Sequence, residues 1–336
     1  MKDGKITLED VANLARVSRT SVSSVLNNAA PVRMSAATRQ KILDAAQKLN
    51  YRRNIAASIL AGGNSGLVGI LIDAHAEYRS FAILREVESA AKKRGLRILT
   101  SFTHDDLNEM QRSLQTMHYY GVEGVICLSH QYPGMADTFQ SLFAEETNIA
   151  FFESPNLENA SYVEFSRLEA FKSLLSDLKA RNVRRFFASM ANPFWNSEKK
   201  LMQEFSAALK WNGIQFDTRK TFFIYDENQT TAECTRILAE KFCRMKEPPE
   251  FIFIDDAVHA VSFHSQLTAR GWHLPDDLMI YGGNGDPLFA CLASPIQSFD
   301  SHYAEIAEAL LDMAIHPGKK TVKVVIESEY KPGCAE

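Results

Sequence analysis

The chain has 336 residues, of which 46% are hydrophobic and 23% are charged, a composition typical of soluble globular proteins with two or three domains. It contains no apolar run of the roughly 18–20 residues that a membrane span requires, and its amino terminus lacks the apolar stretch of a secretory signal. Five scattered cysteines without a CxxC pair indicate reduced thiols and a cytoplasmic protein.

The net charge of −4 is spread unevenly along the chain. Residues 1–60 contain ten lysines and arginines against four acidic residues, which gives this region a charge of +6 and leaves −10 for the remainder. A basic segment on an acidic body favours a polyanion as the partner of the first sixty residues. A solvated basic tail is the alternative, but the hydrophobic pattern of the segment argues against it.

Three short helices are predicted within this basic segment. Thr7 is placed to cap the first helix, with Asp10 as the acid of a capping box. Ser18 is a candidate cap for the second helix, and the third begins near Ser35. Apolar residues recur at helical spacing in the first two segments: Leu8, Val11, Ala12 and Ala15; and Val22, Val25 and Leu26. The third helix is expected to bury Ile42, Leu43, Ala46 and Leu49.

The second of these helices has the surface of a DNA-reading helix. Two short helices separated by a tight turn, with a third as support, form the helix-turn-helix plan. Opposite its apolar stripe the second helix carries one arginine and otherwise small, hydrogen-bonding side chains, which suits a major groove about 12 Å wide. Other small three-helix bundles show similar stripes, so the stripes alone leave that alternative open.

A fourth short helix is predicted at residues 54–61, before a flexible Gly-Gly-Asn-Ser-Gly linker. A helix of about eight residues is unstable alone in water. A hinge that folds only against DNA would have this composition, with small alanines for close approach and one large apolar side chain to wedge between base steps. An ordinary interdomain helix is the alternative.

A dense match to a known family is carried by Ile6–Ala12, Val17–Asn27, Thr38-Arg39 and Leu49–Tyr51. In these motifs the chain closely resembles the LacI/GalR (lactose/purine repressor) family, and the rest of the chain resembles it by pattern. The resemblance implies a transcription repressor that binds a pseudo-palindromic double-stranded DNA operator as a homodimer, with a tetramer as the alternative. It also implies control by a small-molecule effector, a sugar or a related metabolite.

The resemblance assigns DNA contacts to particular positions. Arg19 and Thr20 begin the recognition helix and are expected to read base edges, whereas Ser24 stands where most members have a base-reading arginine. Leu60 matches the leucine that levers open the central minor-groove step. The full set of expected DNA-binding residues is Thr7, Ser18, Arg19, Thr20, Ser23, Ser24, Asn27, Arg33, Arg39, Tyr51, Ala57 and Leu60.

From Leu67 onwards, segments with strand and helix patterns alternate. This alternation predicts an α/β fold with parallel sheets covered by helices on both faces. Strands are expected at 67–72, 98–101, 122–128, 149–152, 185–189, 221–225, 251–255 and 278–282. Together with the resemblance, the pattern predicts an all-α headpiece and a two-lobed core of doubly wound sheets like that of periplasmic binding proteins.

The expected domain boundaries follow from these patterns. They are a headpiece at 1–52, a hinge helix and linker at 53–66, and a core at 67–336. The resemblance further implies three chain crossings between the lobes, near 162–166, 295–301 and 318–322. The N-terminal lobe is then about 67–163 plus 297–320, and the C-terminal lobe is about 164–296 plus 321–336.

An effector is expected beyond the carboxyl ends of the strands, in the crevice between the lobes. Aromatic, amide and charged side chains after the strands could stack on a sugar or base and bind its hydroxyls, although an ordinary loop or packing role is the alternative for each. The candidates are His75, Tyr78, Arg79, Ser129, Asn192, Trp195, Lys199, Tyr225, Asp255 and Asn284.

Three of these positions depart from the family pattern. Ala76–Arg79 replaces the usual Asn-Pro-Phe loop, Asn284 replaces a common ligand-binding aspartate, and Lys199 replaces an arginine that commonly grips effectors. Lysine cannot reproduce the bidentate fork of arginine. An unusual effector, or none, therefore stays open beside an ordinary sugar.

Signs of catalysis are weak in this sequence. Asp255-Asp256 resembles a pair of carboxylates, but acids are ordinary at a helix N-terminus, and the nine histidines show no metal-ligand spacing. We expect no enzymatic activity, no cofactor, no metal and no membrane partner. The alternative function is a solute-binding protein with the same core, which would need a signal peptide and no headpiece.

Overall fold

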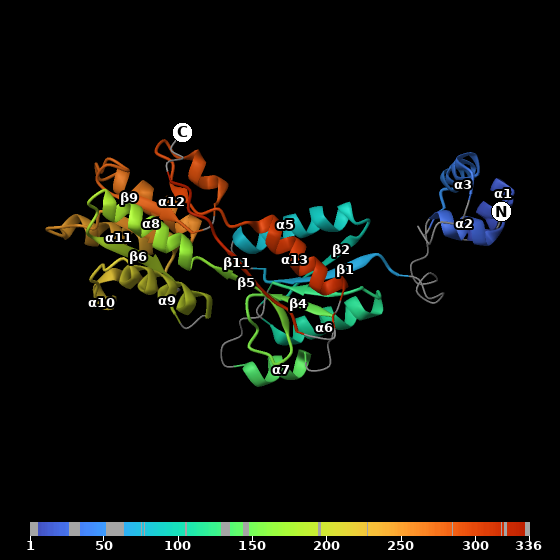
Figure 1. The fold of residues 1–336 in the computed structure, drawn as a ribbon, viewed down its shortest axis with the longest axis horizontal. Helices are drawn as coiled ribbons and strands as arrows, with labels where there is room; N and C mark the ends of the chain where they lie inside the picture. Colours follow the sequence, from blue (N-terminus) through green and yellow to red (C-terminus); the bar gives the residue numbers. More distant parts are fainter. Residues whose placement is uncertain are drawn as a thin grey trace. The chain divides into compact units, whose positions relative to one another are not determined.

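The computed structural model describes residues 6–26, 34–51, 64–74, 76, 78–104, 106–128, 135–143, 148–193, 196–226, 228–283, 285–316, 318 and 321–332. The chain divides into two compact units, Met1–Ser65 and Gly66–Glu336 (Figure 1). Within the described ranges, none of the helices combines the length and the hydropathy that a membrane-spanning helix needs.

The first unit, the headpiece, contains the three predicted helices: α1 (Leu8–Ala15), α2 (Arg19–Leu26) and α3 (Ala36–Lys48). The capping box of α1 is confirmed, because the Thr7 side chain accepts the Asp10 N–H while the Asp10 carboxylate accepts the Thr7 N–H at 2.8 Å. Ser18 Oγ accepts the Ser21 N–H at 3.1 Å and so caps α2 as expected. Ser35 caps α3 in the same way through the Thr38 N–H.

One apolar core joins the three headpiece helices. Val11, Val22 and Ile42, one from each helix, are completely buried at its centre. The prediction that Leu43 is buried is wrong, since 40% of its surface is exposed. Ala45 is buried in its place, because successive residues of a helix lie about 100° apart and only the stripe through Ile42 faces α1 and α2.

The second unit, the core, is built on two sheets, and every strand pair in both of them is parallel. The six-stranded sheet has the order β11-β5-β4-β3-β1-β2. Its strands are β1 (Leu67–Ile72), β2 (Arg97–Phe102), β3 (Val125–Cys127), β4 (Ile149–Phe152), β5 (Ser161–Ser166) and β11 (Lys323–Glu327). We call this sheet with its covering helices the N-lobe.

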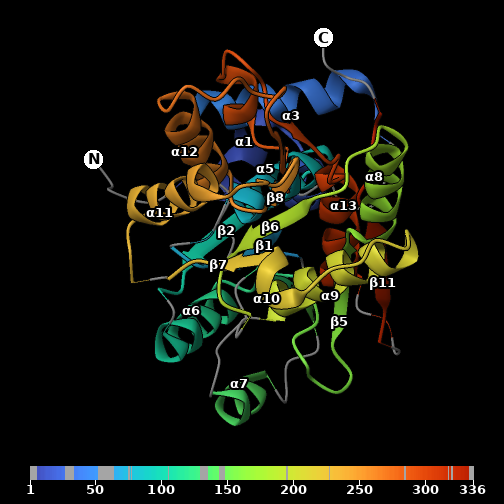
Figure 2. The ribbon, with the colours of Figure 1, turned by 90° about the vertical axis from the view of Figure 1, so that its left-hand side faces the viewer.

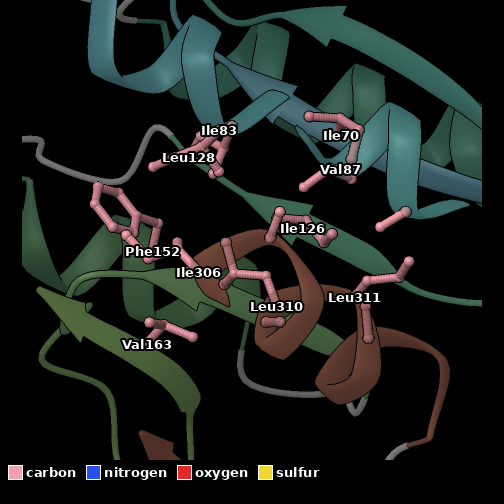
Figure 3. Close-up of a cluster of buried hydrophobic side chains, with 14 of the residues drawn as sticks. Ile70, Ile83, Val87, Ile126, Leu128, Phe152, Val163, Ile306, Leu310 and Leu311 are labelled. Atoms are coloured by element: carbon pink, nitrogen blue, oxygen red, sulfur yellow. The ribbon is translucent and has the colours of Figure 1, made fainter. Parts of the chain in front are cut away.

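Helices cover both faces of the N-lobe sheet. On one face α5 (Tyr78–Lys93) and α13 (Tyr303–Ile315) pack against each other and against the strands. Figure 3 shows this core, with Ile70 and Ile126 on strands facing Ile306 and Leu310 on α13. On the other face lie α6 (Leu107–Tyr119) and α7 (Ala136–Phe143). The uninterrupted apolar runs of β1 and β4 follow from this burial on both faces.

The five-stranded sheet has the order β10-β9-β8-β6-β7, and with its helices it forms the C-lobe. Its strands are β6 (Phe186–Met190), β7 (Phe222–Ile224), β8 (Phe251–Ile254), β9 (Met279–Gly282) and β10 (Gln297–Ser298). Helices α8 (Leu168–Ala180) and α9 (Asn196–Trp211) cover one face, while α11 (Thr231–Arg244) and α12 (Ala257–Thr268) cover the other (Figure 2). The short helices α10 (Thr218–Thr221) and η1 (Pro287–Cys291) lie in connections.

The chain passes between the two sheets at three places that differ in part from the expected ones. The first passage follows β5, which ends at Ser166, and the second lies between β10 and α13. Strand β11 pairs in parallel with β5 in the N-lobe sheet, so the third passage comes after Glu327, whereas the sequence placed 321–336 in the C-lobe. No strand was expected at 323–327, and a strand pattern alone would not show which of the two sheets the strand joins.

Candidate functional site

The headpiece presents the start of α2 to solvent. Arg19 and Thr20, its first two residues, are exposed, while Val22 and Val25 on the opposite face are buried. The Thr20 hydroxyl lies 2.7 Å from the Ser18 hydroxyl, which also caps the helix. The arrangement places one guanidinium and one oriented hydroxyl at the exposed end of a thin helix, as base-edge contacts in a major groove require.

The other predicted DNA contacts differ in their exposure. Thr7, Ser18 and Arg39 are exposed, and Ser23 and Ser24 are half-buried beside the core. Tyr51 packs against the headpiece core, so its ring is held in place after α3. The remaining expected contacts, Asn27, Arg33, Ala57 and Leu60, lie outside the described residues.

In the core, Asp255 at the carboxyl end of β8 is held in a buried ion pair. Its Oδ1 accepts a hydrogen bond from an Arg167 Nη at 2.9 Å, and the two side chains expose only 7% and 6% of their surface. Arg167 lies between β5 and α8, and its guanidinium carbon is 4.9 Å from the centre of the Phe165 ring. A Cβ at Gly283 would come within 1.9 Å of the Asp255 carboxylate. Glycine is therefore required there for the carboxylate to lie against the backbone.

Tyr225, which follows β7, stacks on a histidine. Its ring lies 4.2 Å from the His259 ring at an interplanar angle of 15°. His259 Nδ1 is in turn 2.7 Å from Asp256, the N-cap of α12. Burial would raise the pKa of Asp256, but the hydrogen bonds from His259 outweigh burial and bring that pKa below its usual value. One face of Tyr225 is thus occupied by His259 and could take a ligand only if His259 moved.

On the N-lobe side, Arg79 lies near the end of β4. Its guanidinium carbon is 5.8 Å from the centre of the Phe152 ring. Tyr303, the first residue of α13, is within electrostatic range of Arg79, Arg167 and Asp255, and burial raises the pKa of its hydroxyl. Tyr78 instead bonds within its own helix, where its hydroxyl accepts from Arg85 at 3.2 Å. Tyr303 from the N-lobe and Asp255 from the C-lobe therefore lie near Arg167. Arg79 contributes to the electrostatic environment of Tyr303, whereas Tyr78 bonds to Arg85.

The sequence drew attention to Lys199, but its neighbour Lys200 makes the contacts at the lobe passage. Lys199 is exposed on α9, whereas Lys200 Nζ donates to the Phe165 carbonyl oxygen at 2.5 Å and pairs with Glu153 at 3.1 Å. Asn192 is exposed after β6. The helical phase could have pointed to Lys200, because buried Leu201 and Phe205 fix which face of α9 is turned inward.

Four expected effector-binding residues, His75, Ser129, Trp195 and Asn284, lie outside the described residues. One further group, which the sequence did not indicate, consists of Asp300, His302 and Glu329. Their side-chain nitrogen and oxygen atoms lie within 4.8 Å of one another. Lys331 Nζ is 2.7 Å from Asp300 and 3.5 Å from Glu329. The Lys331 ammonium group thus offsets one of the two negative charges of Asp300 and Glu329, which lie on the second and third passages between the lobes.

A helix-turn-helix headpiece, joined in sequence to a core of two parallel sheets, defines a DNA-binding regulator whose core resembles periplasmic binding proteins. Two family models match the chain: bacterial regulatory proteins of the lacI family over residues 7–54, and the periplasmic binding protein-like domain over residues 147–327. The second match alone spans more than half of the chain. The protein belongs to the LacI family of bacterial transcription regulators.

Similar proteins cover between 75% and 97% of the chain. The chain is 22% identical over 312 residues to the ribose operon repressor of Escherichia coli K12, with 92% of each protein covered. It is 23% identical over 254 residues to the sucrose operon repressor of Klebsiella pneumoniae, with 75% of each covered. The solved structure of the Lac repressor dimer bound to operator and the anti-inducer ONPF matches with a TM-score of 0.77 at 20% identity, over 97% of each chain.

Proposed function

We propose that the protein binds a pseudo-palindromic operator as a homodimer and represses transcription from it, with a small molecule between the lobes changing its affinity for DNA. The observation that carries the proposal is the exposed Arg19-Thr20 pair at the start of a capped helix whose other face is buried. Dimeric headpieces of this type read two half-sites related by a twofold axis. We place this DNA binding in the cytoplasm, where the DNA of a bacterium lies.

A sugar or a related metabolite is the proposed class of effector. The ribose and sucrose operon repressors are named for sugar operons, and the Lac repressor structure holds an anti-inducer. In this chain Arg79, Arg167, Asp255 and Tyr303 come together from both lobes, and such charged and hydroxyl groups bind polar ligands. We propose that the effector acts by binding alone, without catalysis.

A solute-binding protein with the same core is the alternative function. It is disfavoured by the headpiece, which has its own apolar core and matches the lacI regulatory family. A transport protein would gain nothing from a second folded unit with an exposed recognition helix.

Arg19→Ala is expected to relax base preference at one position of each half-site by roughly 1–3 kcal/mol. A bidentate arginine–guanine contact favours guanine over the other bases by about this amount. The measurement is the operator Kd against single-base variants of the site at fixed salt. Arg39→Ala is the matched control, since Arg39 is exposed on α3. It should weaken all sequences alike and flatten the salt dependence. Unchanged base preference in Arg19→Ala would show that Arg19 does not read a base.

A further inference from the structure

Charged side chains hold the first passage between the lobes. The passage runs from the last residues of β5 through Arg167 to α8. Strand β4 ends at Phe152, which pairs with Val163 of β5. From Phe165 onwards, β5 therefore has no strand beside it on the side where β4 lies. The backbone groups beyond this point need other partners, because unpaired buried N–H and C=O groups are costly.

Helix α9 of the C-lobe supplies two of these partners. Lys200 Nζ donates to the carbonyl oxygen of Phe165 at 2.5 Å. One turn later Glu204 Oε2 accepts the N–H of Arg167 at 3.1 Å. Residues four apart lie on one face of a helix. These two oppositely charged side chains therefore hydrogen-bond to the backbone of the passage from the same side. We call Lys200 and Glu204 the α9 clamp.

The N-lobe completes this network through Glu153, directly after β4. Glu153 Oε1 accepts the N–H of Phe165 at 3.2 Å, and Oε2 lies 3.1 Å from Lys200 Nζ. Glu164 of β5 lies 3.2 Å from the same ammonium group. The Lys200 and Glu153 side chains expose 24% and 16% of their surface, so salt screens them less than it screens a surface pair. These bonds join the two lobes at this passage, so rotation of the lobes about it would change their geometry.

Burial and charge act against each other at the second member of the clamp. Burial raises the pKa of Glu204, and the positive charges of Arg167 and Lys200 oppose that rise. The two cations therefore favour the ionised form of this carboxylate, and displacement of α9 away from the passage would separate Glu204 from Arg167.

We propose that the α9 clamp couples the effector site to lobe orientation and so sets operator affinity; this inference rests on the proposed function. Helix α9 begins at Asn196, just after the loop that carries the candidate effector residue Asn192. It packs on α8 and the sheet through buried Leu201 and Phe205, so a ligand that shifts its first turn moves the helix as a body. Lys200 and Glu204 pass that movement to the passage.

Lys200→Gln tests the proposal, with Lys210→Gln as the matched control at an exposed position of the same helix. Loss of the clamp should change the operator Kd by about 2- to 30-fold, the range found for residues that carry coupling between sites. Lys210→Gln should leave the Kd within about twofold, and Lys200→Arg should retain most of the wild-type affinity because it keeps the charge. Glu204→Gln serves as a second variant if Lys200→Gln does not fold.

A double-mutant cycle and amide hydrogen exchange decide between coupling and a merely structural role. Lys200→Gln combined with Glu153→Gln should change the Kd by much less than the product of the single effects. The amides of Phe165 and Arg167 should exchange faster in Lys200→Gln than in Lys210→Gln. A wild-type Kd in Lys200→Gln, or independent effects in the cycle, would overturn the proposal. If the wild-type protein bound no operator, the proposed function would fail. Independently of that result, amides of Phe165 and Arg167 that exchange in Lys200→Gln at the wild-type rate would reject the clamp.

Discussion

Val22→Asp is expected to abolish specific operator binding while leaving the core folded. Val22 is completely buried where α1, α2 and α3 meet. An ionised carboxylate there has no partner among the residues of this apolar core, and its burial costs several kcal/mol. A three-helix unit of this size has only a few kcal/mol of stability to lose.

The measurement is the operator Kd of the full chain, together with thermal unfolding of the core. Because specific binding exceeds non-specific binding by about 10³-fold or more, we expect the Kd to rise by at least that factor. Leu43→Asp is the matched control, since it adds the same charge to the headpiece at a position that is 40% exposed. Operator binding by Val22→Asp at wild-type affinity would show that the headpiece is not the reading unit.

Arg167→Met is expected to destabilise the core by about 3–5 kcal/mol, because it leaves the Asp255 carboxylate buried without its cation. The pair spans 88 residues of sequence and lies at the carboxyl end of β8. Removing both charges, in Arg167→Met combined with Asp255→Asn, should recover much of the loss, since a buried pair contributes less than the cost of breaking it.

Urea unfolding measures this effect as a change in midpoint at constant slope. Arg236→Met is the control, because its ion pair with Glu240 at 2.7 Å is largely exposed, at 49% and 35% of the two side chains. Such a pair contributes at most about 1 kcal/mol. Equal losses in the two variants would mean that the Arg167–Asp255 pair is solvated in solution.

Local features of the headpiece were predictable because short-range rules decide them. The Thr7–Asp10 capping box and the Ser18 cap depend on residues three apart, and the apolar stripe of each helix follows from a period of 3.6. The error at Leu43 has the same origin. A Leu next to Ile42 at the edge of a stripe is assigned to the core by hydrophobicity, whereas the rotation of α3 buries the smaller Ala45.

The core was predictable as alternating strands and helices but not in its long-range pairings. Strand β11 at Lys323–Glu327 was not among the expected strands. Its partner β5 lies some 160 residues earlier, and nothing local selects that sheet over the other one. The Arg167–Asp255 pair is hidden for the same reason. The choice between Lys199 and Lys200, by contrast, could have been made from the helical phase of α9, since buried Leu201 and Phe205 set its rotation.

Selection of bound sequences from random DNA duplexes by the purified protein, at fixed salt, tests the central claim most directly. The claim is that the headpieces of a homodimer read two half-sites. We expect enrichment of a pseudo-palindrome of about 16–20 base pairs with a deformable central step. Enrichment of a single, non-repeated half-site would contradict the dimer, and no enrichment at any salt concentration would contradict sequence-specific DNA binding by this protein.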